Sequence, residues 1–441
     1  MNPFTFSAPR DGKRRASIFG VTLATVALVF GACQTVTSPT PEGPTPTATA
    51  TTVEGTPPTD EFGLVTVPPG EPIHIVFWGV LSGGPAFLGE DVKQGIEIAL
   101  DDKGGKLLGR DIRFTTEDAL CSPEGGTSAA TKVAADTTVA GVIGAVCTDE
   151  VRGGIQTITE AGLTTISASA SRANLTAPDR GPEFAGFLRT AQSDLLQGNM
   201  VAEYMYNQLG KRTLATIHDG SGYAQGIVEV AAARFTALGG TVTKQEAVSV
   251  GQTDMSTVLT SVAADNPDVL YYPIFMPEGG FLTTQAKTTP GLEDTILFSS
   301  DGLFTPSFIS AVGEDALNMY LSSPDTTKFA AGYQDLLTKR AAKYGGTTLG
   351  PYHAHAYDAT NMVLAAIEKV AVTGADGTIY IGRKALRDAI YATQGFRGLT
   401  GVLTCGQYGD CGSPILAVYQ VTAREVGGEW PPATVFEQPT S

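Results

Sequence analysis

From Pro72 onward the chain repeats one pattern: a short apolar run rich in β-branched residues, a turn, and then a segment with apolar residues at helical spacing. Residues 73–78, 112–115 and 142–146 are three such runs in succession. Short, bounded apolar runs are typical of strands that are buried on both faces. Strands that alternate with helices form parallel sheets joined by right-handed crossovers. The pattern therefore predicts an α/β fold.

A second series of the same kind follows the first. Residues 163–166 complete the first set of predicted strands, and a new set begins at residues 214–217, 269–272 and 296–298. Helices are predicted at residues 91–103, 125–136, 193–209, 354–370 and 383–391, and closing strands near 399–404 and 415–421. Two tandem series predict two Rossmann-like lobes with a ligand cleft at their interface.

The turn after the strand at 142–146 is the first candidate for a binding site. Cys147, Thr148, Asp149 and Glu150 follow the strand, and helical spacing begins there. Thr148 occupies the expected N-cap position, with two acidic residues in the first turn. Open α/β sheets bind ligands at the carboxyl ends of their strands, and the free N–H groups of a helix start attract anions. We therefore expect an anionic ligand group to bind at this turn.

The N-terminal segment has the features of an export signal. Basic residues at 13–15 precede an apolar run at 18–30, which is shorter than the roughly 20 residues that span a bilayer. The run ends in small residues before Cys33, which resembles the bacterial lipobox, although Phe30 replaces the usual leucine. We expect a lipoprotein signal peptide over 1–32 and lipidation of Cys33. An ordinary signal peptide is the alternative, and export by the Sec or the twin-arginine route is left open.

Composition limits the partners of the chain. Residues 33–70 are mostly Thr, Pro, Ala, Gly and Glu, which cannot bury a core, so they predict an extended tether. The net charge is −16, from 29 basic and 45 acidic residues. This charge argues against a nucleic-acid partner and against electrostatic adsorption to anionic lipid. The membrane is therefore expected to be contacted only through the N-terminal lipid.

Four further cysteines agree with export. Cys121 and Cys147 each follow a predicted strand, and Cys405 and Cys411 bracket a turn sequence. We predict that each pair forms a disulfide, as is common in exported proteins. Zinc binding is the competing interpretation, but the CxxC and histidine spacings of zinc sites are absent from the sequence. No metal and no cofactor is expected.

The order of several short motifs resembles that of the type I periplasmic binding proteins, in particular the leucine/isoleucine/valine-binding proteins of ABC importers. The resemblance covers about residues 72 to 425 and includes these segments: residues 81–83, 104–110, 117–123, 141–147, 218–223, 267–268 and 356–359. In that family two α/β lobes, joined by a three-segment hinge, close on one amino acid. The resemblance implies a first lobe of residues 71–190 plus about 321–403, and a second lobe of 191–320 plus about 404–430.

The same resemblance implies roles for individual residues. Thr148 and Ser171 fall where hydroxyl groups bind the substrate, Thr148 at the α-carboxylate, and Ser169 falls where the backbone contacts the ligand. Asp301 falls where an acidic residue pairs with the α-ammonium group. Tyr223 and Phe275 match aromatic residues of the second lobe, and Cys121 and Cys147 match a cysteine pair beside the site.

Some residues depart from the family pattern or suggest other chemistry. Asp149 and Glu150 replace small polar residues, and we expect their side chains to point outward and complement the helix dipole. Leu88 replaces an aromatic residue that often closes the pocket. His353 and His355 are expected to be exposed rather than to bind a metal, and the His218-Asp219 pair is expected to line the cleft or hinge rather than to act as acid and base.

We therefore expect an extracytoplasmic substrate-binding lipoprotein that passes a branched-chain or other small amino acid, or an amide, to an ABC permease. A ligand sensor for a membrane receptor is the first alternative, because the same two-lobed clamp serves both. An enzyme that uses Ser169 or Ser171 is the second alternative, but the sequence holds no GxSxG, GxxxxGK[ST] or HExxH motif.

Overall fold

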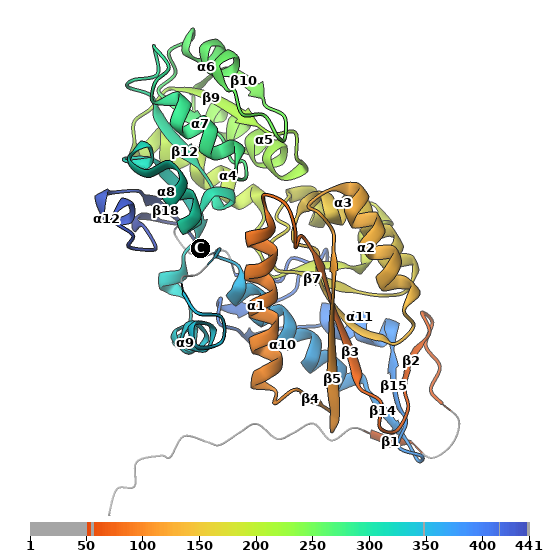
Figure 1. Ribbon diagram of the computed structural model, residues 1–441. Coiled ribbons are helices and arrows are strands. Elements are labelled where there is room, and N and C mark those ends of the chain that lie inside the picture. The colour runs from red at the N-terminus through yellow and green to blue at the C-terminus, as the bar shows by residue number, and fades with distance from the viewer. Residues whose placement is uncertain (1–50, 54–56, 347–348, 414, 439–441) are drawn as a thin grey trace, which may run out of the picture. The chain divides into compact units, whose positions relative to one another are not determined.

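The computed structural model describes residues 51–53, 57–346, 349–413 and 415–438. The predicted signal peptide and Cys33 lie outside these residues. The first lobe is built on a six-stranded sheet in the order β4-β5-β3-β6-β7-β8 (Figure 1). Five of its strands are parallel, and β4 (Lys106–Leu107) pairs antiparallel with β5. The five are β3 (Ile73–Gly79), β5 (Arg110–Asp118), β6 (Val139–Gly144), β7 (Thr165–Ser167) and β8 (Phe187–Arg189).

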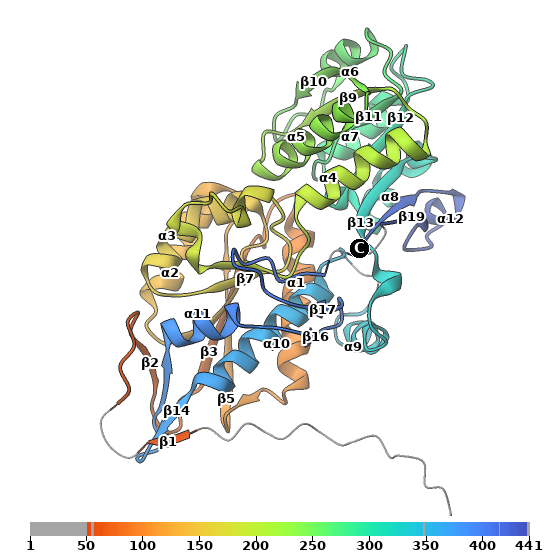
Figure 2. The same ribbon diagram turned by 180° about the vertical axis from the view of Figure 1, so that it is seen from behind.

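Helices cover both faces of this sheet because its central strand is apolar on both faces. Ile75 and Phe77 of β3 belong to the core cluster that includes α1 (Ala86–Asp102) and α10 (His353–Val370). Val76 and Trp78, which point the opposite way, pack with α2 (Pro123–Ala135) and α3 (Thr148–Glu160). The helix pairs α1 with α10 and α2 with α3 lie side by side (Figures 1 and 2). Because successive side chains of a strand point to opposite faces of the sheet, this one apolar run contributes to two cores.

The second lobe is built on a seven-stranded sheet in the order β10-β9-β11-β12-β13-β18-β19. The first five of these strands are parallel and the last two antiparallel. They are β10 (Thr241–Ala247), β9 (Thr213–His218), β11 (Val269–Tyr271), β12 (Ile296–Ser299), β13 (Tyr320–Pro324), β18 (Leu416–Gln420) and β19 (Ala433–Glu437). Its helices are α4 (Asp194–Glu203), α5 (Gly222–Ala237), α6 (Ser256–Ala263), α7 (Glu278–Ala286) and α8 (Pro306–Val312).

The chain passes between the two sheets three times. It leaves the first sheet after β8, returns after β13 through α9 (Tyr333–Tyr344) to α10 and α11 (Arg383–Tyr391), and crosses again before β18. A short hairpin of β16 (Phe396–Arg397) and β17 (Val402–Leu403) precedes the last crossing, and α12 (Ala423–Val426) lies between β18 and β19. This arrangement confirms the predicted fold of two α/β lobes joined by three segments.

The expected tether is wrong for its last part. Residues 64–67 form strand β2 (Leu64–Val67), which pairs with β15 (Ile379–Gly382), and Val65 and Val67 are buried. The same small sheet holds β14 (Val372–Gly374) and β1 (Thr51–Val53). The Asp60 carboxylate accepts the N–H groups of Lys384 and Ala385, at 2.9 and 3.0 Å, at the start of α11. Two alternating valines, Val65 and Val67, are the buried residues of the strand that this edge of the sheet accepts.

None of the helices in the described part of the chain combines the length and the hydropathy of a membrane span. Further differences from the sequence analysis concern the end of one helix and several elements that were not predicted. The helix expected at 193–209 is α-helical only to Glu203 and continues as a π-helix over Tyr204–Gln208. The elements β10, β13, α7 and α9 were not predicted.

Candidate functional site

The turn between β6 and α3 forms one wall of the site. The N-cap residue of α3 is Cys147, which has extended backbone angles, and Thr148 is the first helical residue. The prediction of Thr148 as N-cap was therefore wrong by one position. The N-cap lies one residue earlier because the Glu150 carboxylate accepts the N–H of Cys147 at 2.9 Å, which fixes the start of the helix there. Thr148 itself is buried, with 2 % of its surface exposed.

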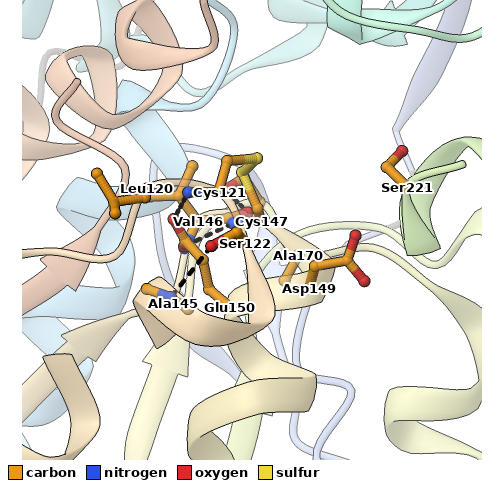
Figure 3. Close-up of a disulfide and its surroundings, with 12 residues drawn as sticks. Leu120, Cys121, Ser122, Ala145, Val146, Cys147, Asp149, Glu150, Ala170 and Ser221 are labelled. Carbon is orange, nitrogen blue, oxygen red and sulfur yellow. Dashed lines mark hydrogen bonds between the residues drawn. A yellow bond between two sulfur atoms is a disulfide. The ribbon is translucent and has the colours of Figure 1, made fainter. Parts of the chain in front are cut away.

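Glu150 points into the protein, so the expectation of an outward side chain was wrong. Its two oxygens also accept the N–H groups of Cys121 and Val146, at 2.9 and 2.8 Å (Figure 3). Peptide N–H groups of a tight turn need acceptors, and a buried carboxylate supplies several at once. Burial raises the pKa of Glu150 to about 7, against the three N–H donors that lower it.

Asp149 is not outward either. Its Oδ2 accepts the N–H of Gly222 at 2.8 Å, at the start of α5 in the second lobe. On its other side Oδ1 forms an ion pair with Arg152 at 3.1 Å. Figure 3 shows its carboxylate turned toward Ser221, away from the disulfide. Neither acidic residue lines the cavity described below, so neither places its carboxylate against a ligand there.

Both predicted disulfides are present. Cys121 and Cys147 are joined with their Cα atoms 5.3 Å apart, and Cys405 and Cys411 with theirs 3.8 Å apart. The first disulfide ties the end of the β5 loop to the start of α3 (Figure 3). Cys147 is itself a wall residue of the cavity.

The loop after β7 carries the two serines. Ser169 donates its hydroxyl proton to the carbonyl oxygen of Val146 at 2.8 Å, which fastens this loop to the β6 turn. Arg189, fully buried, donates to the carbonyl oxygen of Arg172 at 2.9 Å and pairs with Asp410 at 2.5 Å. The loop is therefore held from both sides, and Ser171 lies within it.

Asp301 lies on the second lobe, directly after β12, and is the acceptor of three side chains. Its Oδ1 accepts from Gln197 at 2.7 Å and from Tyr223 at 3.2 Å, and its Oδ2 accepts from Tyr352 at 2.8 Å. Burial raises the pKa of Asp301, and the donors from Tyr352, Gln197 and Tyr223 partly offset this. Tyr223 also packs against Phe275, with ring centroids 5.2 Å apart.

All six predicted ligand-binding residues surround one cavity of about 20 Å³. Its wall also includes four residues that were not predicted as ligand contacts: Leu88, Val146, Cys147 and Tyr352. Leu88 takes the place in which the family often has an aromatic residue. Tyr352 lies on the second segment between the lobes, directly before α10, and no local sequence signal marks it. Gln197, which reaches Asp301 from α4, was missed for the same reason.

The histidines lie elsewhere and are not exposed as expected. His353 and His355 are 1 % and 3 % exposed, because α10 turns them toward α1 and the hinge. His353 Nδ1 lies 3.0 Å from the buried Asp91 carboxylate, which Arg340 also approaches at 3.3 Å. Burial lowers the pKa of His355 to about 3.

His218 lies apart from the cavity. It accepts the N–H of Gly220 at 3.1 Å and does not line the cavity. Across the described ranges, no three His, Cys, Asp or Glu side chains are grouped as metal ligands.

Comparison with known proteins agrees with this geometry. A profile described as "Periplasmic binding protein" matches residues 72–425. The Leu/Ile/Val-binding protein homolog 3 of Brucella melitensis is 26 % identical over 343 residues, which are 77 % of this chain and 89 % of that protein.

Two solved structures share the fold. The branched-chain amino acid transporter substrate binding protein of Streptococcus pneumoniae, in complex with isoleucine, has a TM-score of 0.70 at 21 % identity and covers 83 % of this chain and 99 % of its own. An ABC transporter solute binding protein of R. palustris, in complex with benzoate, has a TM-score of 0.70 at 19 % identity and covers 83 % of this chain and 96 % of its own. The chain therefore belongs to the periplasmic binding proteins, among the type I members that include the Leu/Ile/Val-binding proteins.

Proposed function

We propose that this protein is an extracytoplasmic substrate-binding protein that captures a branched-chain or other small amino acid and delivers it to an ABC permease. The observation that carries the proposal is the cavity itself. Thr148 and the start of α3 enter it from the first lobe, and the Asp301 carboxylate enters it from the second. The names of relatives such as the Leu/Ile/Val-binding protein homolog 3 support the same ligand class.

An amino acid zwitterion matches the two sides of the cavity. Its carboxylate suits the N–H groups at the start of α3 and the Thr148 hydroxyl, because helix starts stabilise anions. Its ammonium suits Asp301, a buried carboxylate that has no basic residue among the donors that contact it. The apolar part would contact Leu88 and the rings of Tyr223 and Phe275. The carboxylate of the ligand thus meets hydrogen-bond donors, its ammonium meets a carboxylate, and its apolar part meets apolar side chains.

Capture is proposed to proceed by hinge closure. The cavity volume of about 20 Å³ accommodates roughly one water molecule, far less than leucine. The walls must therefore separate to admit an amino acid. They belong to different lobes joined by three segments, so a rotation of the lobes opens the site without disturbing either sheet. We propose the lobe bounds of the sequence analysis with two changes: β13 (Tyr320–Pro324) and β19 (Ala433–Glu437) belong to the second lobe, whose sheet they complete, and residues 60–67 are attached to the first.

We further propose binding without catalysis and attachment to the membrane through a lipid on Cys33. Ser169 supports the first point, because its hydroxyl proton goes to a backbone carbonyl rather than to a base. The cavity wall in the described part of the chain contains no histidine. The sequence 30–33 supports the second point, because it resembles a lipobox.

A thermal-shift and calorimetric titration with the twenty amino acids tests the proposal. Leucine, isoleucine or valine should raise the melting temperature, since a ligand at 100 times its Kd adds about 2.7 kcal/mol. Asp301→Asn keeps the shape and removes the charge, and it should weaken binding by at least about 100-fold, as expected for one partner of a buried ion pair.

The matched control is Glu314→Gln, which changes an exposed carboxylate of the same lobe and should leave affinity unchanged. Retained affinity in Asp301→Asn, or a melting temperature that no amino acid moves, would contradict the proposal.

A further inference from the structure

Asp194 is a fully buried carboxylate at the start of α4. It is the first residue of α4, its surface is 0 % exposed, and neither of its oxygens has a hydrogen-bond partner in the described part of the chain. An ionised group in this position is costly unless a positive charge or a donor compensates it. The residue is held in place by its peptide N–H, which donates to the carbonyl oxygen of Ser171 at 2.8 Å.

Asp194 adjoins the wall of the proposed ligand cavity. Ser171, whose backbone it contacts, lines that cavity, and the Ser171 hydroxyl lies near enough to lower the pKa of Asp194. The negative charge of Asp194 acts on Tyr223 and Tyr352, which are both wall residues, and on Tyr271 behind them. Asp301 lines the cavity, and Asp194, which is not itself a wall residue, places a second carboxylate directly behind Ser171.

The neighbouring arginines do not neutralise this pair. Arg189 lies near Asp194, but its guanidinium pairs with Asp410 and with Thr176. Arg172 is also near, but it donates to the carbonyl oxygen of Gly222 and pairs with Glu229 at 3.6 Å. Among the ion pairs of the described residues, none includes Asp194 or Asp301. When both carboxyl groups are ionised, the site therefore holds two negative charges that no ion pair of the described residues compensates.

We propose that Asp194 is a second carboxylate that recognises the cationic nitrogen of the ligand, so that the site accepts ligands with an ammonium group and rejects carboxylic acids without one. The inference rests on the proposed function and narrows its ligand class. It separates this protein from relatives of the same fold such as the R. palustris protein, whose structure holds benzoate.

The electrostatics give the expected pH dependence. Burial and the charge of Asp301 raise the pKa of Asp194, Ser171, Arg189 and Arg172 lower it, and the resulting pKa is about 7. An ammonium group favours the ionised form, so binding lowers this pKa and releases protons near pH 7. Affinity for an ammonium ligand should therefore rise from pH 6 to pH 8, whereas an anionic ligand without nitrogen would add a third negative charge.

Three probes of one shape test the ligand class: leucine, 3-methylbutylamine, which lacks the carboxylate, and 4-methylpentanoate, which lacks the ammonium. Titration calorimetry of the full protein in two buffers of different ionisation enthalpy measures affinity and proton release together. We expect 3-methylbutylamine to bind at least tenfold more tightly than 4-methylpentanoate. We expect leucine to release protons at pH 7.

Asp194→Asn should weaken the binding of leucine and of 3-methylbutylamine at least tenfold, and it should abolish the proton release on leucine binding. Its ligand-free melting temperature should equal or exceed that of the wild type, because an unpaired buried charge is removed. Asp194→Glu keeps the charge and should restore proton release.

The outcomes separate this inference from the proposed function. If the protein binds leucine but binds 3-methylbutylamine and 4-methylpentanoate with equal affinity, the inference is overturned and the proposed function stands. Unchanged leucine affinity in Asp194→Asn, or wild-type binding without proton release, would also overturn it. A wild-type protein that binds no leucine, isoleucine or valine would instead overturn the proposed function.

Discussion

Glu150 holds the turn between β6 and α3 from inside the protein. One carboxylate accepts three peptide N–H groups from two separate stretches of chain. In the sequence the residue resembles an ordinary acid in a first helical turn, for which exposure is the usual outcome. The N–H groups that require an acceptor become visible only when the loop after β5 lies beside the turn, so the sequence alone could not place this side chain.

The pH dependence of stability follows from Glu150. Its pKa is about 7 in the folded protein, raised from an ordinary value of 4.5. A raised pKa means that the folded state binds the proton more tightly. Its contribution is therefore complete below about pH 4.5 and is lost as the pH rises through 7. The free energy of unfolding should fall by about 3 kcal/mol over this interval from Glu150 alone.

Urea denaturation at pH 5 and pH 8 measures this effect. Glu150→Gln should flatten the difference between the two pH values relative to the wild type, while Asp194 keeps contributing in the same direction. Glu160→Gln is the control, because Glu160 is an exposed residue of the same helix. An undiminished pH difference in Glu150→Gln would show that its carboxyl group does not carry the effect.

At the residue scale the sequence placed ligand candidates better than it placed buried charges. Thr148, Ser169 and Ser171 follow strands of the first sheet, and the ends of parallel strands share one sheet edge, so their convergence was predictable. Asp301 follows a strand of the second sheet, and only the family resemblance indicated that it would face them. His353 was not predictable in this way. Its partner Asp91 is 262 positions away, and the pairing depends on α1 and α10 lying side by side.

Among the elements, the Cys121–Cys147 disulfide links the stability of the fold to the shape of the cavity. The loop it closes spans 26 residues, for which chain entropy predicts about 3–4 kcal/mol of stabilisation. Replacing both cysteines with serine should lower the free energy of unfolding by this amount. It should also weaken the binding of leucine, because Cys147 is part of the cavity wall.

The second disulfide is the matched control. Cys405 and Cys411 are 6 residues apart, which predicts about 2 kcal/mol, and neither lines the cavity. Their double serine variant should lose stability without losing affinity. Chemical denaturation and calorimetry of both variants measure the two effects, and equal changes in affinity would argue that the first disulfide has no local role.

Strands with a clear local apolar pattern were predicted, whereas two strands without one, β10 and β13, were missed. The run at 142–146 identified β6, although the strand ends at Gly144. By contrast β13 reads YLSSP and β10 reads TVTKQEA, and neither contains an apolar run. Both strands form because neighbouring strands supply hydrogen-bond partners in register. Tertiary pairing thus overrides weak local preference in these segments.

At the scale of the whole molecule, the two lobes meet outside the cavity as well as around it. The peptide of Gly222 in α5 is held on both sides by the first lobe: Asp149 accepts its N–H, and Arg172 donates to its carbonyl oxygen. Under the proposed hinge closure, such contacts would stabilise the closed arrangement independently of what the cavity contains. The sequence could not reveal them, since they depend on how the two lobes lie against each other.

Asp149→Ala should therefore weaken leucine binding by about ten- to a hundredfold, the range expected for loss of one charge-assisted hydrogen bond. The loss should fall on the dissociation rate, because the cavity wall is unchanged and only the closed form is destabilised. Stopped-flow measurement of leucine release tests this expectation, with Glu314→Ala as an exposed control. A dissociation rate equal to that of the wild type would rule out a role for this contact in closure.

The attachment of residues 60–67 has a practical consequence. Asp60 and β2 fasten the incoming chain to α11 and β15, and none of these residues belongs to the cavity wall. A fusion partner, a tag or a solid support joined upstream of residue 57 would thus hold the protein by one lobe only and leave the other free to turn. Immobilised copies should keep their full capacity for solute, which suits the protein to use as a sensing element.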